Sequence, residues 1–150
     1  MNSVIGIGAT RTEPDLTATQ AQLACSDVIA RFFKLVDGGQ ASKTMDLFTH
    51  DAVMKMGDIS LSGDALRAAM AGRETDGVRR VHVASPSSFR LTADGGAEAE
   101  TLLQLFVLGE DQANGPKSRA LTRLNDRFVR GDDHVWRLAE RVVTVLAGGE

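Results

Sequence analysis

Tyrosine is absent from the 150-residue sequence, and cysteine and tryptophan occur once each. A lone cysteine can form no internal disulfide and no cysteine-based metal site. Because Cys25 falls within an apolar pattern of helical period, we expect it to pack as a small core residue. The lack of a disulfide framework favours a reducing compartment, so we expect the protein to be cytoplasmic.

Long apolar runs and an excess of positive charge are also missing. No run approaches the ~20 apolar residues of a membrane-spanning helix, so we expect no membrane partner. The net charge is -3 and the arginines are scattered, which gives no electrostatic reason to expect nucleic acid as a partner. Gly6 and Gly8 lack the third glycine of a dinucleotide fingerprint, because Arg11 stands there. Histidines and carboxylates show no metal-ligand spacing, so we expect neither a cofactor nor a metal.

The rest of the composition is that of an ordinary globular domain. Hydrophobic residues make up 43% and charged residues 25%, which argues against a disordered or fibrous chain. Residues 1–15 contain glycine, threonine, proline and charges without periodicity, and we expect a flexible N-terminal arm there. One folded domain over residues 16–146 and a short tail over residues 147–150 complete the predicted organisation.

Three helices are predicted in the first half of the chain. From Leu16 onward, apolar residues recur at helical spacing up to the pair Gly38-Gly39, which predicts a long helix ending at Asp37. The next predicted elements are a helix over 41–48, a strand over 53–56, a strand ending at 62 and a helix over about 65–73.

The second half consists of strands and turns. The predicted strands cover residues 78–84, 89–92, 97–108, 119–130 and 134–146. Helices followed by long antiparallel strands indicate an α+β fold, in which a curved sheet wraps around the N-terminal helices and leaves a pocket at its open end. Residues 102–108 are apolar on both faces apart from Gln104, so we expect other strands or a second subunit to cover the outer face.

Several short motifs follow one another in a characteristic order. They are a long helix ending in Phe-x-x-x-x-Asp-Gly; Met45, Leu47, Phe48, Asp51 and Ala52; Leu61, Gly63, Ala65 and Leu66; Asn125-Asp126-Arg127-Phe128; a Gly-Asp-Asp turn; and Trp136-Arg137-Leu138-Ala139 before Arg141. In this order they resemble the SnoaL-like family of the nuclear-transport-factor-2-like superfamily, over roughly residues 16–146. The resemblance implies a cone-shaped α+β barrel with a deep, mostly apolar cavity. It also implies dehydratase, isomerase, cyclase, epoxide hydrolase or purely binding functions.

The resemblance makes Asp37 the first candidate catalytic residue. In dehydratase-like relatives an acidic residue near the end of the first helix points into the cavity, and here Phe32 and Phe33 could supply an apolar surrounding. Alternatively, Asp37 begins the turn before Gly38, since aspartate readily bonds to the backbone of turns. Those relatives carry a tyrosine five residues before the acid. This chain has Phe32 there, which counts against direct transfer of a dehydratase mechanism.

The second candidate is His82, in a segment that resembles the family's histidine-bearing strand. Strand alternation places Val81 and Val83 on one face and Arg80 and His82 on the other. If the valines face the cavity, His82 faces outward and is structural or intersubunit, which is the arrangement we favour. The alternative is an inward His82 that works with Asp37 as acid or base.

The closing hairpin carries Asp126 on an otherwise apolar face, where a carboxylate needs a partner. With a three-residue turn, Asp126 faces Leu138 and has Glu140 as its diagonal neighbour, and two close carboxylates would suit acid–base work. A one-residue slip instead places Arg137 and Arg141 beside Asp126, and we favour this ion pair. By resemblance, Arg141 is also a cavity cation that could hold a carboxylate or a developing enolate oxygen.

These residues lead to a functional hypothesis. We expect a homodimer formed through the convex face of the sheet, with a pocket for a small apolar or polyketide-like molecule. Gln104 is either a hydrogen-bonding residue of this pocket or an outward residue at the dimer interface.

If the protein is an enzyme, its chemistry is cofactor-free proton transfer of the lyase or isomerase type, with Asp37 as the base. The alternative is a non-catalytic binding or dimerisation module. The predicted catalytic residues are Asp37, His82 and Arg141, and the predicted ligand-binding residues are Phe32, Phe33, Gln104, Asp126 and Trp136.

Overall fold

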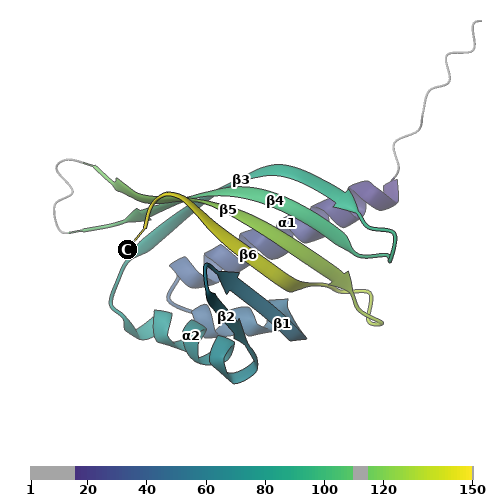
Figure 1. Ribbon diagram of the computed structural model, residues 1–150, viewed down its shortest axis with the longest axis horizontal. Coiled ribbons are helices and arrows are strands. Elements are labelled where there is room, and N and C mark those ends of the chain that lie inside the picture. Colours follow the sequence, from purple (N-terminus) through teal and green to yellow (C-terminus); the bar gives the residue numbers. More distant parts are fainter. Residues whose placement is uncertain (1–15, 110–114, 150) are drawn as a thin grey trace, which may run out of the picture.

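The computed structural model describes residues 16–109 and 115–149, which form a single six-stranded sheet and its covering helices (Figure 1). In chain order the elements are α1 (Leu16–Asp37), the 3-10 helix η1 (Ala41–Leu47), β1 (Phe48–Met56), β2 (Ile59–Ser62), α2 (Gly63–Thr75), β3 (Arg80–Leu91), β4 (Ala97–Val107), β5 (Lys117–Arg130) and β6 (Trp136–Gly148). The strand order across the sheet is β2-β1-β6-β5-β4-β3. The N-terminal arm predicted for residues 1–15 lies outside the described residues.

The arrangement is the predicted α+β fold. Strands β3 to β6 pair antiparallel and arch over α1, which lies across their concave face (Figure 1). Because β1 pairs parallel with β6, the sheet is mixed and not wholly antiparallel as expected. The sheet is also open, since β2 and β3 form its two edges. Helix η1 packs against both α1 and α2 and so joins the two helices at the C-terminal end of α1.

Helix α1 forms because its apolar residues recur at helical spacing and face the sheet. Its buried side chains are Ala21, Cys25, Val28, Ile29, Phe32, Phe33 and Val36. The helix ends where Gly39 adopts the left-handed conformation (φ 75°), which lets the amide of Gln40 donate to the carbonyl of Leu35. Neither α1 nor any other helix of the described ranges is long and apolar enough to cross a membrane.

Strand β3 is continuous, although the sequence predicted two strands there. Pro86 is tolerated because β3 is an edge strand, so the missing amide donor leaves no neighbouring strand unpaired. The pairing with β4 shifts between Pro86 and Ser88, and the strand passes the proline through this bulge. β3 therefore runs as one long edge beside α1, with which it is in contact.

Other boundaries differ from the sequence-based expectation by a few residues. The second helix is of the 3-10 type and ends at Leu47, because Phe48 already belongs to β1 and pairs with Leu138 of β6. Strand β6 continues to Gly148, so residues 147 and 148 belong to the sheet and not to a tail.

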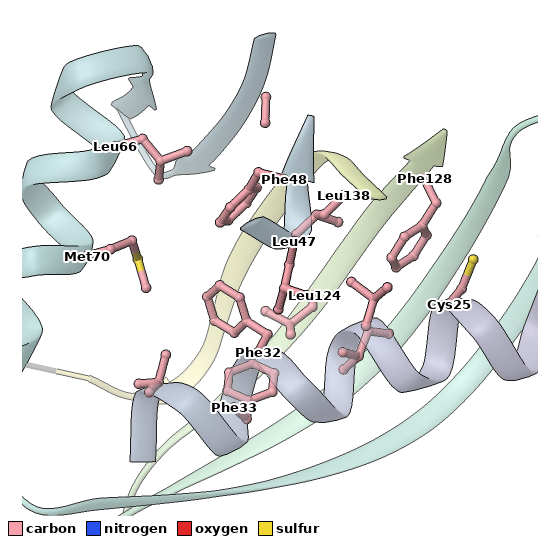
Figure 2. Packing of buried hydrophobic residues seen from close by; sticks show 14 of the residues in the cluster. Cys25, Phe32, Phe33, Leu47, Phe48, Leu66, Met70, Leu124, Phe128 and Leu138 are labelled. Carbon is pink, nitrogen blue, oxygen red and sulfur yellow. The ribbon is translucent and has the colours of Figure 1, made fainter. Parts of the chain in front are cut away.

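The hydrophobic core lies between α1 and the concave face of the sheet (Figure 2). Phe32 and Phe33 project from α1, and Leu66 and Met70 project from α2 toward the same space. The sheet contributes Leu103, Leu124, Phe128 and Leu138. Aromatic side chains of α1 thus occupy much of the space in which the sequence predicted an apolar cavity.

Candidate active site

The last residue of α1 and the beginning of β3 meet in a carboxylate–imidazole pair. Oδ1 of Asp37 lies 2.6 Å from Nδ1 of His82, and Oδ2 of Asp37 accepts a hydrogen bond of 2.8 Å from the backbone N–H of His82. The His82 side chain is 6% exposed and that of Asp37 is 21% exposed. Two contacts to one carboxylate therefore hold the imidazole at the rim of the interior.

This pairing determines which nitrogen of His82 is available for chemistry. A carboxylate only accepts hydrogen bonds, so Nδ1 of a neutral ring carries the proton and donates it to Asp37. Nε2 then carries the lone pair, and it makes no hydrogen bond to the residues of ranges 16–109 and 115–149. Such a ring can accept a proton at Nε2 while the carboxylate stabilises the positive charge that results.

Local sequence explains why the two groups meet. Phe33 and Asp37 are four residues apart on α1 and therefore share one helix face, which is turned toward β3. The ring of Phe33 packs on the ring of His82, with 4.8 Å between the ring centres. The aromatic residue thus supports one face of the imidazole while the carboxylate one turn later bonds its edge.

The expected outward orientation of His82 is wrong. Val81 and Val83 face solvent on the outer side of the sheet, where they are 38% and 44% exposed, and His82 points inward between them. Alternation correctly groups the residues by face. Alternation does not tell which of the two faces is the inner one. At the open end of this sheet the inner face carries polar side chains that bond one another, so polarity does not mark the outer face.

The pKa of His82 is lowered from its usual value of 6.5. Burial is the largest cause, Asp37 opposes it, and the positive charges of Arg73 and Arg80 reinforce it. The ring is therefore neutral at neutral pH, which is the state that a general base requires.

A second acid–base pair lies deeper, between β5 and β6. Nε and Nη2 of Arg141 donate hydrogen bonds of 2.7 and 2.9 Å to the two carboxylate oxygens of Asp126. The side chains are 1% and 0% exposed. The ion pair favoured from the sequence is therefore present, and the alternative, in which Asp126 neighbours Glu140, is not formed, because Glu140 pairs with Arg127.

The hairpin register explains this outcome. Arg130 pairs with Trp136 and Phe128 with Leu138, and the register then shifts between Arg127 and Phe128, so that Asp126 pairs with Arg141. The alternative pairing of Asp126 with Leu138 does not occur, because the turn already places Phe128 opposite Leu138 and the bulge shifts the register by one further residue. Arg137, the other arginine considered, instead binds Asp133 in the turn.

Arg141 is not fully satisfied by Asp126. Its guanidinium carbon lies 4.5 Å from the centre of the Phe32 ring and 5.3 Å from that of Phe33, which places the cation against both aromatic faces. Its third nitrogen, Nη1, is buried and has no hydrogen-bond partner among the described residues. Because Phe33 also packs on His82, the two basic residues contact a shared aromatic side chain.

Two predicted ligand-binding residues lie elsewhere. Gln104 is exposed on the outer face of β4, opposite Val83. It is therefore an outward residue and not a residue of the interior. Trp136 begins β6, five residues or about 16 Å of extended strand before Arg141, and packs at the margin of the core. Phe32, Phe33 and Asp126 do lie beside Arg141, but as buried supports of that residue.

One residue near this site was missed from the sequence. Arg73 lies seven residues after Leu66 and three after Met70, so it shares the buried face of α2 with both. Burial lowers the pKa of Arg73 below its usual value, and the positive charges of Arg80 and Arg141 lower it further. The helical spacing from Leu66 was visible in the sequence and could have identified Arg73 as an inward cation.

Two surface pockets are present besides this site. One lies between α1 and the bulge of β3 and includes Cys25 and Thr101; the other lies between β1 and α2 and includes His50 and Asp64. Neither is lined by Asp37, His82 or Arg141.

Cys25 is buried, as predicted, and burial together with the charge of Asp126 raises the pKa of its thiol to about 12. Such a thiol stays protonated at neutral pH and is a poor nucleophile. Within ranges 16–109 and 115–149, no group of three or more histidine, cysteine, aspartate or glutamate side chains is arranged to hold a metal ion.

Comparison with known families places the chain clearly. The model of the SnoaL-like domain matches residues 17–142, which is most of the chain and includes Asp37, His82, Asp126 and Arg141. A comparison with curated protein sequences finds no match.

Solved structures of the same fold are numerous, and three illustrate the likeness. ActVI-ORFA from Streptomyces coelicolor is 18% identical, with a TM-score of 0.74 over 83% of this chain and 96% of that one. An NTF2-like protein with a cystatin-like fold from Novosphingobium aromaticivorans is 21% identical, with a TM-score of 0.74 over 89% and 87%. A protein from Catenulispora acidiphila in complex with S-DNPA is 20% identical, with a TM-score of 0.70 over 85% and 94%. At such identities the likeness is one of fold.

Proposed function

Because this chain belongs to the SnoaL-like family, we propose that it is an acid–base enzyme that moves a proton next to the carbonyl group of a small, mostly apolar substrate. Dehydration, isomerisation and cyclisation all begin with such a step, so the reaction class is that of a lyase or isomerase. The step needs a base and a stabilised enolate oxygen but no cofactor.

The observation that carries the proposal is the bonded pair of Asp37 and His82. Both oxygens of Asp37 are engaged with His82, which makes the carboxylate a positioning residue and not the base expected from the sequence. His82 is the proton acceptor in this proposal, acting through Nε2. The lowered pKa of His82 keeps the ring in its basic form at neutral pH.

Arg141 supplies the electrostatic part of the mechanism. Asp126 takes two of its nitrogens, and Nη1 remains as a donor without an acceptor. A substrate carbonyl oxygen bound there would gain negative charge as the proton leaves, and a fixed cation in a dry site stabilises that charge. This role stands in for the phenol that dehydratase-like relatives place at the position of Phe32.

The expected small-molecule ligand and the expected homodimer fit the same proposal. The fold accommodates a small molecule in one relative, the Catenulispora acidiphila protein solved with S-DNPA. The exposed Val81 and Val83 give the convex face of the sheet an apolar character that suits a second copy of the chain. We therefore keep a homodimer, a cytoplasmic location and a polyketide-like ligand as parts of the proposal.

Exchange of an α-proton into deuterated water tests the reaction without knowledge of the natural substrate. We expect the wild-type protein to accelerate deuterium incorporation into β-tetralone, a bicyclic ketone, as followed by NMR. His82→Gln removes the base, and we expect a loss of about 100-fold or more. The matched control is His134→Gln, which changes an exposed histidine of a turn. Equal exchange rates for wild type and His82→Gln contradict the proposal.

A second candidate function is favoured by the packing of the core. Phe32 and Phe33 are buried and fill the space beside Arg141, as they would in a binding or dimerisation module that performs no chemistry. In that case the wild type gives no exchange above buffer, and protein purified from its native host carries a ligand detectable by mass spectrometry.

A further inference from the structure

More arginine side chains lie near the site than the contact between Asp37 and His82 needs. Arg73, Arg80 and Arg141 come from α2, β3 and β6, and the charges of Arg80 and Arg141 both act on Arg73. Two of them have carboxylate partners. Arg80 donates to both oxygens of Asp76 at 3.1 and 2.6 Å, and Arg141 donates to both oxygens of Asp126. Arg73 is the third arginine of this group.

Arg73 makes no hydrogen bond and no ion pair with any residue of ranges 16–109 and 115–149. Its position on α2 is nevertheless an inward one. It stands one turn after Met70, which is fully buried, on the helix face that packs toward Phe32 and Phe48 (Figure 2). The negative charge of Asp76 offsets only part of the effect that burial, Arg80 and Arg141 have on Arg73, so a further anion would stabilise this group.

The second observation is the unpaired nitrogen of Arg141. Arg141 is 1% exposed, and its Nη1 has no acceptor among the described residues. A buried donor without an acceptor costs free energy, and in native proteins it commonly marks a place where a ligand or water binds. Arg73 and Arg141, whose charges act on each other, thus each have guanidinium nitrogens without an acceptor among the described residues.

We propose that Arg73 binds a carboxylate of the ligand beside Arg141, so that the substrate is a small apolar carboxylic acid that also carries the reacting carbonyl group. The identity of the reaction in this inference rests on the function proposed above, but the anion site itself does not depend on catalysis. Arg73 takes the carboxylate from the α2 side, and Nη1 of Arg141 keeps its role at the carbonyl oxygen. The carbon next to that carbonyl group then lies toward Nε2 of His82.

A carboxylate suits this arrangement better than a larger anion. A planar guanidinium matches the two oxygens of a carboxylate, and such pairs are stronger than bonds between neutral groups. The aromatic rings of Phe32 and Phe33 against Arg141 leave an apolar surrounding for the rest of the molecule. Arg73 therefore acts as a determinant of specificity, because it selects for charge where the aromatic side chains select for apolar bulk.

The experiment compares benzoate with benzamide, its neutral isostere, by titration calorimetry at low salt. We expect benzoate to bind the wild type and benzamide to bind at least about tenfold more weakly, which corresponds to one charge-assisted hydrogen bond. Arg73→Gln is expected to weaken benzoate binding about tenfold and to leave benzamide binding unchanged. Arg73→Lys keeps the charge and should recover part of the affinity.

The matched control is Arg67→Gln, which removes the same charge from an exposed position of the same helix. It should change benzoate affinity by less than about twofold, since an exposed charge is screened by water. Because Arg73 is repelled by Arg80 and Arg141, Arg73→Gln should also fold with an unchanged or higher melting temperature. A lower melting temperature contradicts the inference, since it would assign Arg73 a structural role.

The failure of this inference is distinguishable from failure of the proposed function. If benzoate binding depends on Arg73 but the wild type exchanges no α-protons of any probe, the anion site stands and the enzyme proposal fails. If exchange of β-tetralone depends on His82 but benzoate binds wild type and Arg73→Gln equally, the function stands and the anion site is wrong. Absence of saturable benzoate binding to the wild type also overturns the inference.

Discussion

The concave side of the sheet carries two acid–base pairs that differ chiefly in their contact with water. Asp126 and Arg141 are almost completely buried and use four atoms in two parallel hydrogen bonds. Asp37 and His82 lie at the rim, where the carboxylate retains some exposure and the imidazole keeps one nitrogen without a partner. The buried pair of Asp126 and Arg141 therefore stabilises the sheet, whereas His82 of the rim pair can still exchange a proton.

The difference follows from where the strands place each residue. Asp126 and Arg141 lie opposite each other at the centre of the sheet, on strands that have neighbours on both sides. His82 lies on the edge strand β3 and is held by a residue at the very end of α1. A charge at the centre must be neutralised in place, whereas a titratable group at an open edge can remain accessible.

The largest expected effect comes from breaking the buried pair. Asp126→Asn leaves the Arg141 cation in a dry site without a counter-charge, and we expect it to lower the free energy of unfolding by about 3–5 kcal/mol. Chemical denaturation followed by circular dichroism measures this. The matched control, Asp133→Asn, removes an exposed partner of Arg137 and should change stability little. An effect of Asp126→Asn no larger than that of the control contradicts the structural role of the pair.

A smaller effect is expected from the rim pair. Asp37→Asn keeps the size of the side chain but weakens one charge-assisted contact at a partly hydrated position, so we expect a loss of about 1–2 kcal/mol. The same variant should slow α-proton exchange far more than it lowers stability, because Nδ1 of His82 loses the carboxylate that orients it. If Asp37→Asn destabilises the fold as strongly as Asp126→Asn, the contrast between the two pairs is wrong.

The third prediction concerns pH and is the smallest in energy. His82 has a pKa below 6.5 in the folded protein, so the unfolded chain binds its proton first as the pH falls. Stability is therefore complete above pH 6.5 and declines as the pH drops from there through the folded pKa. Denaturation midpoints measured between pH 8 and pH 5 should show this decline, and His82→Gln should flatten it. A wild-type curve that rises over this interval contradicts the lowered pKa.

Most of the fold could be predicted from the sequence because it depends on local periodicity. The apolar spacing before Gly38-Gly39 located α1 to the residue, and strand alternation located the long hairpins within a few residues. Two features that depend on neighbours distant in the chain were missed: the parallel pairing of β1 with β6, and the bulge that carries β3 past Pro86.

The candidate site was predictable in its members but not in its geometry. Asp37, His82 and Arg141 were all named, and the pairing of Asp126 with Arg141 was favoured. The orientation of His82 was not found, because alternation separates two faces without saying which is inner. The inward position of Arg73 was also missed, although its helical spacing from Leu66 and Met70 is visible in the sequence.

Nitrogen-15 NMR of the histidine side chains tests the central claim most directly. We expect His82 to be neutral and protonated at Nδ1 at pH 7, and to titrate below 6.5. In Asp37→Asn the ring should lose its preference for the Nδ1-protonated form. A His82 ring protonated at Nε2 in the wild type, or one that titrates above 6.5, would contradict the assignment of His82 as a base held by Asp37.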